Sequence, residues 1–362
     1  MARNRVIYQS EALFSSKDAT ATIVGHHKQL ERVQSANYSF NINRQDVNQY
    51  GQLAKMGSLI LDAPTVSADF SYLATDGFNE RLLGFYVRTG DAEDEGGFAS
   101  GHLVEGSGRN LFISTVGEGN DALGTTLAST HDVIGIGNAY LSDYSLDLSV
   151  GSLPTVSVTF EGSNINVSAG NSISNPAVNQ TDGSAVGSTV TLPAVTTGVS
   201  DEIALRPGDV TVDITSFDGV SLSDLTASAD AIHVQSASLS LPLSRSPLER
   251  LGTKYAYARS VDYPVTASLS VNAIVNELEA GALNDLVTTD TEKTITLSLK
   301  GHAGDDALIY TLKGCTLNSE SFSSSVGSNK SVDLTFTTQI GGPNDTTHGI
   351  LVSGRNDTAG YA

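Results

Sequence analysis

The chain has 362 residues, enough for one large hydrophobic core or two of ordinary size. Forty acidic residues against 20 basic ones give a net charge of −20, which argues against a protein that grips nucleic acid by its phosphates. The single cysteine, Cys315, excludes an internal disulfide, and no apolar run approaches the length of a signal segment or a membrane span. We therefore expect a protein that is assembled in the cytoplasm and has no membrane partner.

Two segments in the first part of the chain alternate apolar and polar residues. Their apolar positions are Tyr38, Phe40 and Ile42 in one segment and, after Pro64, Val66, Ala68, Phe70 and Tyr72 in the other. This alternation predicts two β-strands, each with one buried face. Residues 78–83 instead show helical spacing, so we expect a short helix there that covers one face or edge of the sheet.

The densest charge cluster follows, between residues 86 and 132, and consists of Asp91, Glu93, Asp94 and Glu95. It resembles the start of a calcium-binding loop, but the twelfth position is His102 rather than the bidentate glutamate that such a loop needs. We expect a solvated acidic loop. The sequence 135–137, Gly-Ile-Gly, lacks the third glycine and the following helix of a phosphate-binding loop, and is interpreted as a turn.

Residues 141–160 predict a hairpin that turns through Gly151 and Ser152. The next stretch, 163–205, is dominated by Ser, Asn, Thr and Gly and offers little apolar surface. It is expected to form a polar connection or an extended hairpin. Residues 342–362 are expected to form a polar C-terminal arm.

Much of this pattern occurs a second time. Residues 33–51 match residues 234–252 at seven of 19 positions, and residues 141–160 match residues 317–336 at nine of 20. The strand after Pro64 has a counterpart after Pro264 at a shift of 199 residues, and a second short helix is expected at 276–286. The repeat predicts the same domain twice, over residues 1–162 and 206–341.

The predicted fold class is mainly β, with two tandem β-sandwich domains that each carry one short flanking α-helix. The duplicated positions are apolar core residues, Gly, Ser and Arg, so we expect no catalytic residues, no metal site, no cofactor and no enzymatic activity. Arg44 and Arg245 are a duplicated charged pair at the end of a predicted strand. Each either pairs with a carboxylate of its own domain or bridges to a neighbouring subunit.

Together these features resemble a phage tail tube protein, also called a major tail protein, of the subclass whose tube domain is duplicated in one chain. The resemblance rests on residues 32–40, 44–51, 64–72, the helix near 78–85 and the hairpin 141–160. It covers nearly the whole chain as a pattern, without a diagnostic motif. It implies two tail-tube-like sandwiches per chain, whose sheets join edge to edge around a channel, and a trimeric ring with pseudo-sixfold symmetry.

The resemblance also implies that rings stack into the virion tail, with tail sheath, tape measure and tail terminator proteins as further partners. Genomic DNA would pass through without specific binding, because three chains at −20 each carry −60 per ring. Candidate inter-subunit contacts are Arg44 and Arg245, candidate lumen-facing acids are Asp69, Asp147 and Asp333, and the candidate inter-ring loop contains Asp91, Glu93, Asp94 and Glu95.

Two other classes of protein stay open at this point. A capsid decoration protein or a two-domain adhesin would explain the duplication and the acidity without forming hollow rods. A β-rich carbohydrate-active tail component would need a cleft lined by aromatic residues, and the lack of tryptophan counts against it.

Overall fold

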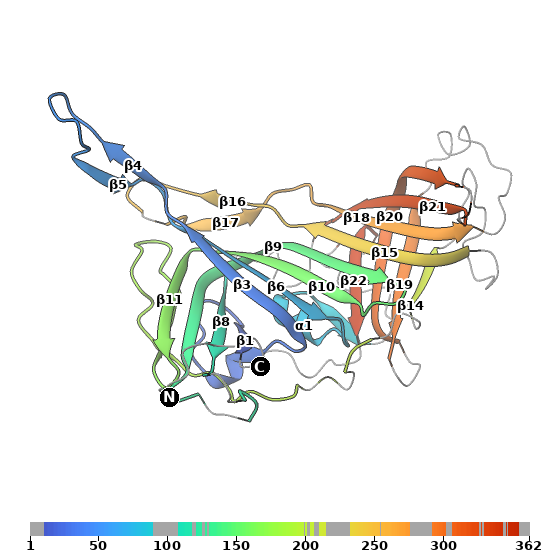
Figure 1. The fold of residues 1–362 in the computed structure, drawn as a ribbon, viewed down its shortest axis with the longest axis horizontal. Helices are drawn as coiled ribbons and strands as arrows, with labels where there is room; N and C mark the ends of the chain where they lie inside the picture. Colours follow the sequence, from blue (N-terminus) through green and yellow to red (C-terminus); the bar gives the residue numbers. More distant parts are fainter. Residues whose placement is uncertain are drawn as a thin grey trace.

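In the computed structural model, nearly all the regular secondary structure of the described residues is antiparallel β-sheet, which confirms the predicted mainly-β class (Figure 1). The two halves of the chain contain equivalent sets of strands, which we call the first and the second unit. The structure describes residues 11–354 except 90–107, 118–120, 125–126, 129, 199, 201–202, 206–209, 215–231, 254, 276–291, 302–305, 326, 328, 343–344 and 346.

The elements follow the chain in this order. In the first unit they are β1 (Glu11–Ser16), η2 (Val24–His26), β2 (His27–Gln29), β3 (Val33–Asn41), β4 (Arg44–Val47), β5 (Gly57–Ile60), β6 (Thr65–Leu73), α1 (Phe78–Leu83), β7 (Val87–Thr89), β8 (Arg109–Thr115), β9 (Asp132–Ser149), β10 (Thr155–Gly162), β11 (Asn164–Ala169), β12 (Ile173–Ser174) and β13 (Thr189–Val190). In the second unit they are β14 (Val210–Ile214), β15 (Ile232–Pro242), β16 (Arg245–Leu248), β17 (Ala258–Val261), β18 (Thr266–Val275), β19 (Lys293–Lys300), β20 (Asp306–Ser323), β21 (Ser331–Gln339) and β22 (Gly349–Gly354).

One central sheet runs through both units in the order β20-β21-β18-β15-β9-β10-β6-β3. In each unit a second layer is built on the N-terminal half of a long strand. In the first unit β8 and β11 pair with β9, and β1 pairs with β8. In the second unit β19 and β22 pair with β20, and β14 pairs with β19. Apolar side chains from both layers and from α1 form one hydrophobic core that extends across the two units. Each unit is therefore a sandwich in which one strand of 18 residues belongs to both layers.

The strand pairing repeats in detail between the units. Gln34 is an extra residue in the pairing of β3 with β6, and Gln235 is the extra residue in the pairing of β15 with β18. Ser142 in β9 and Asn318 in β20 are a second pair of equivalent bulges. Bulges bend and twist the strands that contain them, and here they recur at equivalent positions of both units.

The long strands also bend at equivalent positions. Asn138 in β9 has φ 51° and Gly314 in β20 has φ 67°, in the left-handed region that Gly and Asn tolerate best. Each bend lies where the strand leaves one layer and enters the other. The side chain differs between the copies, so this feature of the repeat is not visible as an identity in the sequence.

Two expectations need correction. The apolar alternation after the two prolines predicts a shift of 199 between β6 and β18, whereas the pairing gives 201, since Val33 lies opposite Tyr72 and Val234 opposite Ala273. A slip of two residues keeps every side chain on its own face, so alternation alone does not reveal it. Residues 135–137 are part of β9 and do not form a turn. Glycine is needed at position 137 for another reason, since the chain near Pro176 crosses directly over it and leaves no room for a Cβ.

The strands extend beyond the predicted domain limits. β11 lies within the predicted connection 163–205, and β22 lies within the predicted arm 342–362, where five of its six residues are buried. The two strands are equivalent, because Ile165 pairs with Ile136 of β9 and Ile350 pairs with Leu312 of β20. The helix α1 is present as predicted, whereas the second expected helix, 276–286, lies outside the described residues.

Candidate functional site

The two units are joined by strand pairing between β9 and β15. The pairing is antiparallel and runs from Ser236 opposite Ser149 to Pro242 opposite Asp143. On the apolar face Leu239 lies opposite Leu146, and their side chains are 1% and 0% exposed. The junction is therefore part of the hydrophobic core, and one sheet continues from unit to unit.

A second strand pair connects the units in the other layer. β7 of the first unit pairs in parallel with β22 of the second, with Val87 opposite Val352. Gly354 in β22 packs against the Asp76 carbonyl, where a Cβ would overlap that oxygen. Because this contact lies in a different layer from the β9–β15 pairing, the two together fix the rotation of one unit relative to the other.

A buried polar cluster lies between the units. Glu80 on α1 accepts hydrogen bonds at its Oε1 from the hydroxyls of Tyr72 at 2.8 Å and Tyr144 at 3.2 Å. The Tyr144 hydroxyl also bonds the Tyr310 hydroxyl of the second unit at 2.7 Å. All four side chains are fully buried or nearly so. Burial raises the pKa of the Glu80 carboxyl, although the two hydroxyls that donate to it oppose this shift.

This raised pKa predicts a specific pH dependence. The folded chain binds the Glu80 proton more tightly than the unfolded chain, whose carboxyl has the ordinary value of 4.5, so this group lowers stability as pH rises from 4.5 through the folded pKa. We expect Glu80→Gln to unfold with a free energy higher than wild type by on the order of 1 kcal/mol at neutral pH, and with little difference near pH 4. Chemical denaturation across pH 4–8 measures this. A difference that does not change with pH would contradict the assignment, and Tyr144→Phe should instead destabilise the protein at every pH, by about 1–3 kcal/mol.

The hairpin β16–β17 of the second unit lies over the first unit. Arg245 donates from Nε to the Leu141 carbonyl at 3.2 Å, and its guanidinium carbon lies 5.3 Å from the centre of the Tyr140 ring. Arg259, which is buried, bonds Glu161 at 3.1 Å. Arg245 thus contacts the other unit of its own chain, through the Leu141 carbonyl and the Tyr140 ring.

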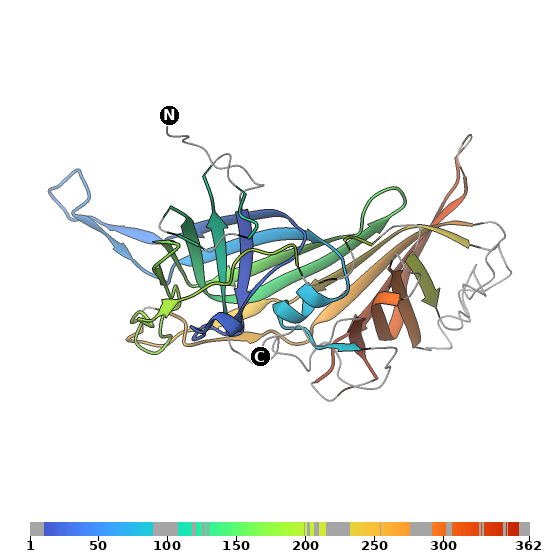
Figure 2. The same ribbon diagram turned by 90° about the horizontal axis from the view of Figure 1, so that it is seen from below.

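Arg44 occupies the equivalent place in the hairpin β4–β5 but has different surroundings. This hairpin projects from one end of the molecule, away from the second unit (Figures 1 and 2). Arg44 is exposed, and its side chain has no hydrogen-bond or ion-pair partner among the residues that the structure describes. The hairpin also exposes a series of large apolar side chains: Val47, Tyr50, Leu53, Met56, Leu59, Ile60 and Leu61. So many exposed large apolar side chains in one hairpin are typical of a contact with another protein.

The central sheet ends in two edges that have no partner strand within the described chain. One is β3, and the other is the C-terminal half of β20, residues 316–323, which pairs only with β21. Tyr38, Phe40 and Phe322 on these edges are 42%, 59% and 48% exposed. Their counterparts Leu239, Leu241 and Leu146 at the β9–β15 junction are at most 1% exposed. Equivalent strand edges are thus paired with each other at the centre of the sheet and have no partner at its two outer edges.

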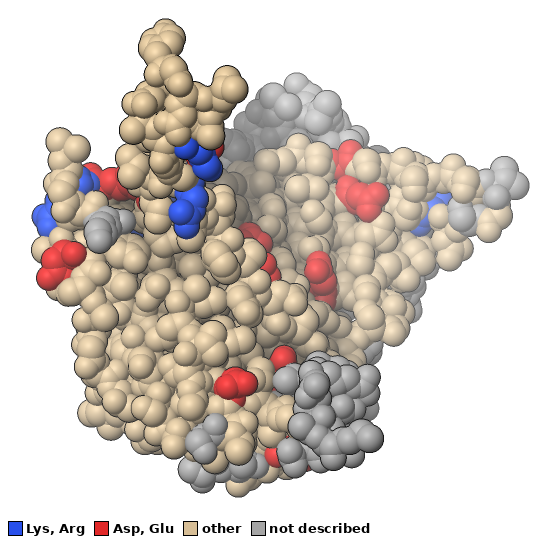
Figure 3. Space-filling model, turned by 60° about the vertical axis from the view of Figure 1, so that its left-hand side comes forward, with Lys and Arg blue, Asp and Glu red and all other residues tan. Residues whose placement is uncertain are grey.

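The face of the central sheet opposite the core is polar and exposed. The register places Asp69, Asp147 and Asp333 on this one face, because residues paired across neighbouring strands point to the same side of a sheet. The connecting pairs are Thr159–Asp69, Thr155–Asp147, Ser238–Asp147, Ser270–Ser238 and Asn272–Asp333. The eight strand segments of the sheet, taking residues 143–149 of β9 and 316–323 of β20, contain no Lys or Arg. Figure 3 shows separated acidic side chains on a largely uncharged surface, with basic side chains gathered below the projecting hairpin.

The sequence identifies part of this arrangement. It finds the acids of the polar face and Arg245, but not the β9–β15 junction or the cluster around Glu80. Glu80 has polar neighbours in sequence, Asn79 and Arg81, so nothing in the stretch Phe78–Leu83 marks it as buried. The acidic loop with Asp91, Glu93, Asp94 and Glu95 lies outside the described residues. In the described part of the chain, no three His, Cys, Asp or Glu side chains converge as metal ligands.

A scan against protein-family models and a search of curated proteins found no match for this chain. Among the described residues, no helix has the length and apolar character needed to cross a membrane.

Proposed function

We propose that the protein is the structural subunit of a tube, in which copies pair edge to edge into closed rings and the rings stack, as in a phage tail tube through which DNA is ejected. The observation that carries this proposal is the continuous sheet between the two units. β9 and β15 pair with each other in the chain, whereas the equivalent strands β20 and β3 each have one edge without a partner strand in the described chain, at opposite ends of the same sheet. An exposed strand edge favours pairing with another chain, and ring closure removes all such edges.

The number of chains in a ring follows from the size of the bore. Strands about 4.8 Å apart and tilted by about 40° close into a barrel whose diameter, measured between backbones, is about 48 Å for 24 strands and about 32 Å for 16. Inward side chains reduce each diameter by about 10 Å. With eight central strands per chain, three chains leave a bore wider than a DNA double helix, whereas two chains leave no room for its hydration. A trimeric ring therefore fits passage of DNA.

The polar face supports the same use. If it lines the bore, DNA phosphates meet Ser, Thr, Asn and carboxylate groups such as Asp69, Asp147 and Asp333, and no Lys or Arg from the sheet strands. Like charge and neutral hydroxyls give the DNA nothing to adhere to, so it slides. Genomic DNA would thus pass through without a binding site, and the tail of a virion is the location that this role implies.

Negative-stain electron microscopy of the purified protein tests the proposal. We expect rings or filaments with a stain-filled centre, and a mass of three chains for the smallest closed ring by native mass spectrometry. Compact monomers at every salt concentration would count against a tube and would favour a decoration protein or an adhesin. Binding of an oligosaccharide in an aromatic-lined cleft would favour the carbohydrate-active alternative.

A further inference from the structure

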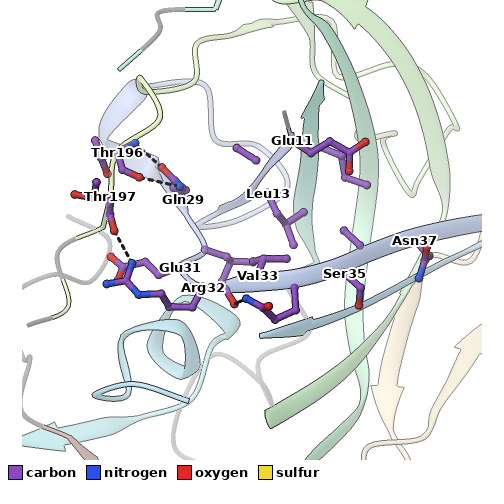
Figure 4. A pocket seen from close by; sticks show the side chains of 15 residues that line it. Glu11, Leu13, Gln29, Glu31, Arg32, Val33, Ser35, Asn37, Thr196 and Thr197 are labelled. Atoms are coloured by element: carbon purple, nitrogen blue, oxygen red, sulfur yellow. Dashed lines mark hydrogen bonds between the residues drawn. The ribbon is translucent and has the colours of Figure 1, made fainter. Parts of the chain in front are cut away.

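A cavity of about 740 Å³ lies beside the N-terminal part of β3 in the first unit. Its walls come from β1, β3 and the segment around Thr196 (Figure 4). The Thr196 amide donates to Gln29 Oε1, and the Thr196 carbonyl accepts from Gln29 Nε2, which holds this segment in place. Leu13 and Val33 give it an apolar side, and Ser35 and Ala36 line it along the free edge of β3. The cavity therefore opens where the central sheet lacks its next strand.

The equivalent position in the second unit is filled. There the walls are Val210, Val212 and residues 234–237, which correspond to Glu11, Leu13 and residues 33–36, and the space left is about 40 Å³. The turn from β9 to β10 of the first unit occupies it, with Leu148 and Pro154 among the lining residues. The Val150 amide donates to the Gln235 carbonyl at 3.0 Å, which fixes the turn in this place.

We infer that the cavity beside β3 receives the β20–β21 turn of a second copy of this chain, and that β3 pairs with β20 in the register of the β15–β9 junction. This inference rests on the self-assembly proposed above and specifies its geometry. At the internal junction Leu239 lies opposite Leu146 and Ser238 opposite Asp147. Equivalent residues differ by 201 in number between β3 and β15 and by 176 between β9 and β20. The same register therefore places Tyr38 opposite Phe322 and Asn37 opposite Ser323 of the second copy.

The surroundings of the two strands agree with this register. Tyr38 and Phe322 are exposed in the single chain, and the pairing covers both in one step. If the neighbour is placed as the register requires, the apolar hairpin β4–β5 lies over the second unit of the neighbour, just as β16–β17 lies over the first unit of its own chain. Arg44 then takes the place of Arg245 and donates to the neighbour's carbonyl at position 317, the counterpart of Leu141.

Paired cysteines test the register in the intact chain. Cys315→Ala, which copies the equivalent buried Ala139, provides a cysteine-free background. We expect Asn37→Cys with Ser323→Cys to form disulfides between copies on mild oxidation, giving a ladder that ends at a covalent ring on a denaturing gel. Ser238→Cys with Asp147→Cys is the matched control, since those side chains lie 2.7 Å apart within one chain and should close a disulfide in the monomer.

A second pair separates the register from assembly itself. Asn37→Cys with Ser321→Cys is displaced by two residues and should cross-link at least ~10-fold less, because diagonal neighbours lie beyond the usual span of a disulfide. Suppose that the reduced protein assembles but that only the displaced pair cross-links, or that neither pair does. The proposed register is then wrong, whereas the proposed tube is not contradicted. If the protein neither assembles nor cross-links while the internal control closes, both this inference and the proposed function fail.

Discussion

Replacing Phe40 by aspartate should abolish assembly while leaving the monomer folded. Phe40 is 59% exposed in the single chain, so the free energy of unfolding should change by no more than about 0.5 kcal/mol. In the proposed ring the same side chain lies under the neighbouring β20 strand, close to Glu320. Burying an unpaired carboxylate there costs several kcal/mol at each contact between chains. Light scattering and electron microscopy measure the loss of assembly, and chemical denaturation measures the stability of the monomer.

The duplication supplies a matched control for this variant. Leu241 occupies the same position at the junction within the chain and is fully buried. Leu241→Asp should therefore destabilise the monomer by more than about 4 kcal/mol or prevent folding. Phe40→Leu, which copies the residue of the internal junction, should keep assembly. If Phe40→Asp forms the same rings or filaments as wild type, the edge of β3 is not a contact between chains.

Replacing Gly137 by alanine should destabilise the fold by about 3 kcal/mol or more. A Cβ at this position would overlap the Pro176 carbonyl oxygen and lie 2.7 Å from the Ala177 amide nitrogen. Both obstacles are backbone atoms, so relief requires the segment around Pro176 to leave β9. Hydrogen bonds from the Asn164 side chain to the Pro176 carbonyl and from the Val178 amide to Asn138 hold that segment in place.

Thermal unfolding of the Gly137→Ala variant measures this effect against Gly25→Ala. At Gly25 a Cβ would meet nothing within 4 Å, so the change there should cost less than about 0.5 kcal/mol or stabilise slightly. Equal melting temperatures for the two variants would show that the crossing of Pro176 over β9 is not a tight contact.

The repeat and the main strands are predictable from the sequence because they rest on period-two alternation and on glycines at fixed turns. Gly51 with Gly252 and Gly151 with Gly327 all have φ between 86° and 91°, so the left-handed turns retain glycine in both copies. The alternation of β6 and β10 likewise identifies Phe70 and Phe160, whose rings stack in the core.

Other features leave weaker marks in the sequence. The bend at Asn138 and Gly314 uses two residue types, and β22 follows a polar stretch that hides its short apolar core. The β9–β15 junction depends on which edge of one unit meets which edge of the other, and alternation carries no information about that. Glu80 was missed because its partners Tyr72, Tyr144 and Tyr310 come from three distant strands.

The covalent link between the two units has a kinetic and thermodynamic consequence. In the proposed ring every second joint is intramolecular, so its effective concentration is set by the chain and does not fall on dilution. A ring of three chains then forms through two bimolecular associations and one closure, whereas six separate domains would need five associations and one closure. The loss of translational and rotational entropy, estimated at about 4–15 kcal/mol per association, is therefore avoided three times. The two kinds of joint also differ in sequence: Leu239, Leu241 and Leu146 are buried at the joint within the chain, whereas the proposed joint between chains has Tyr38, Phe40 and Phe322 at the equivalent positions, all exposed in the single chain.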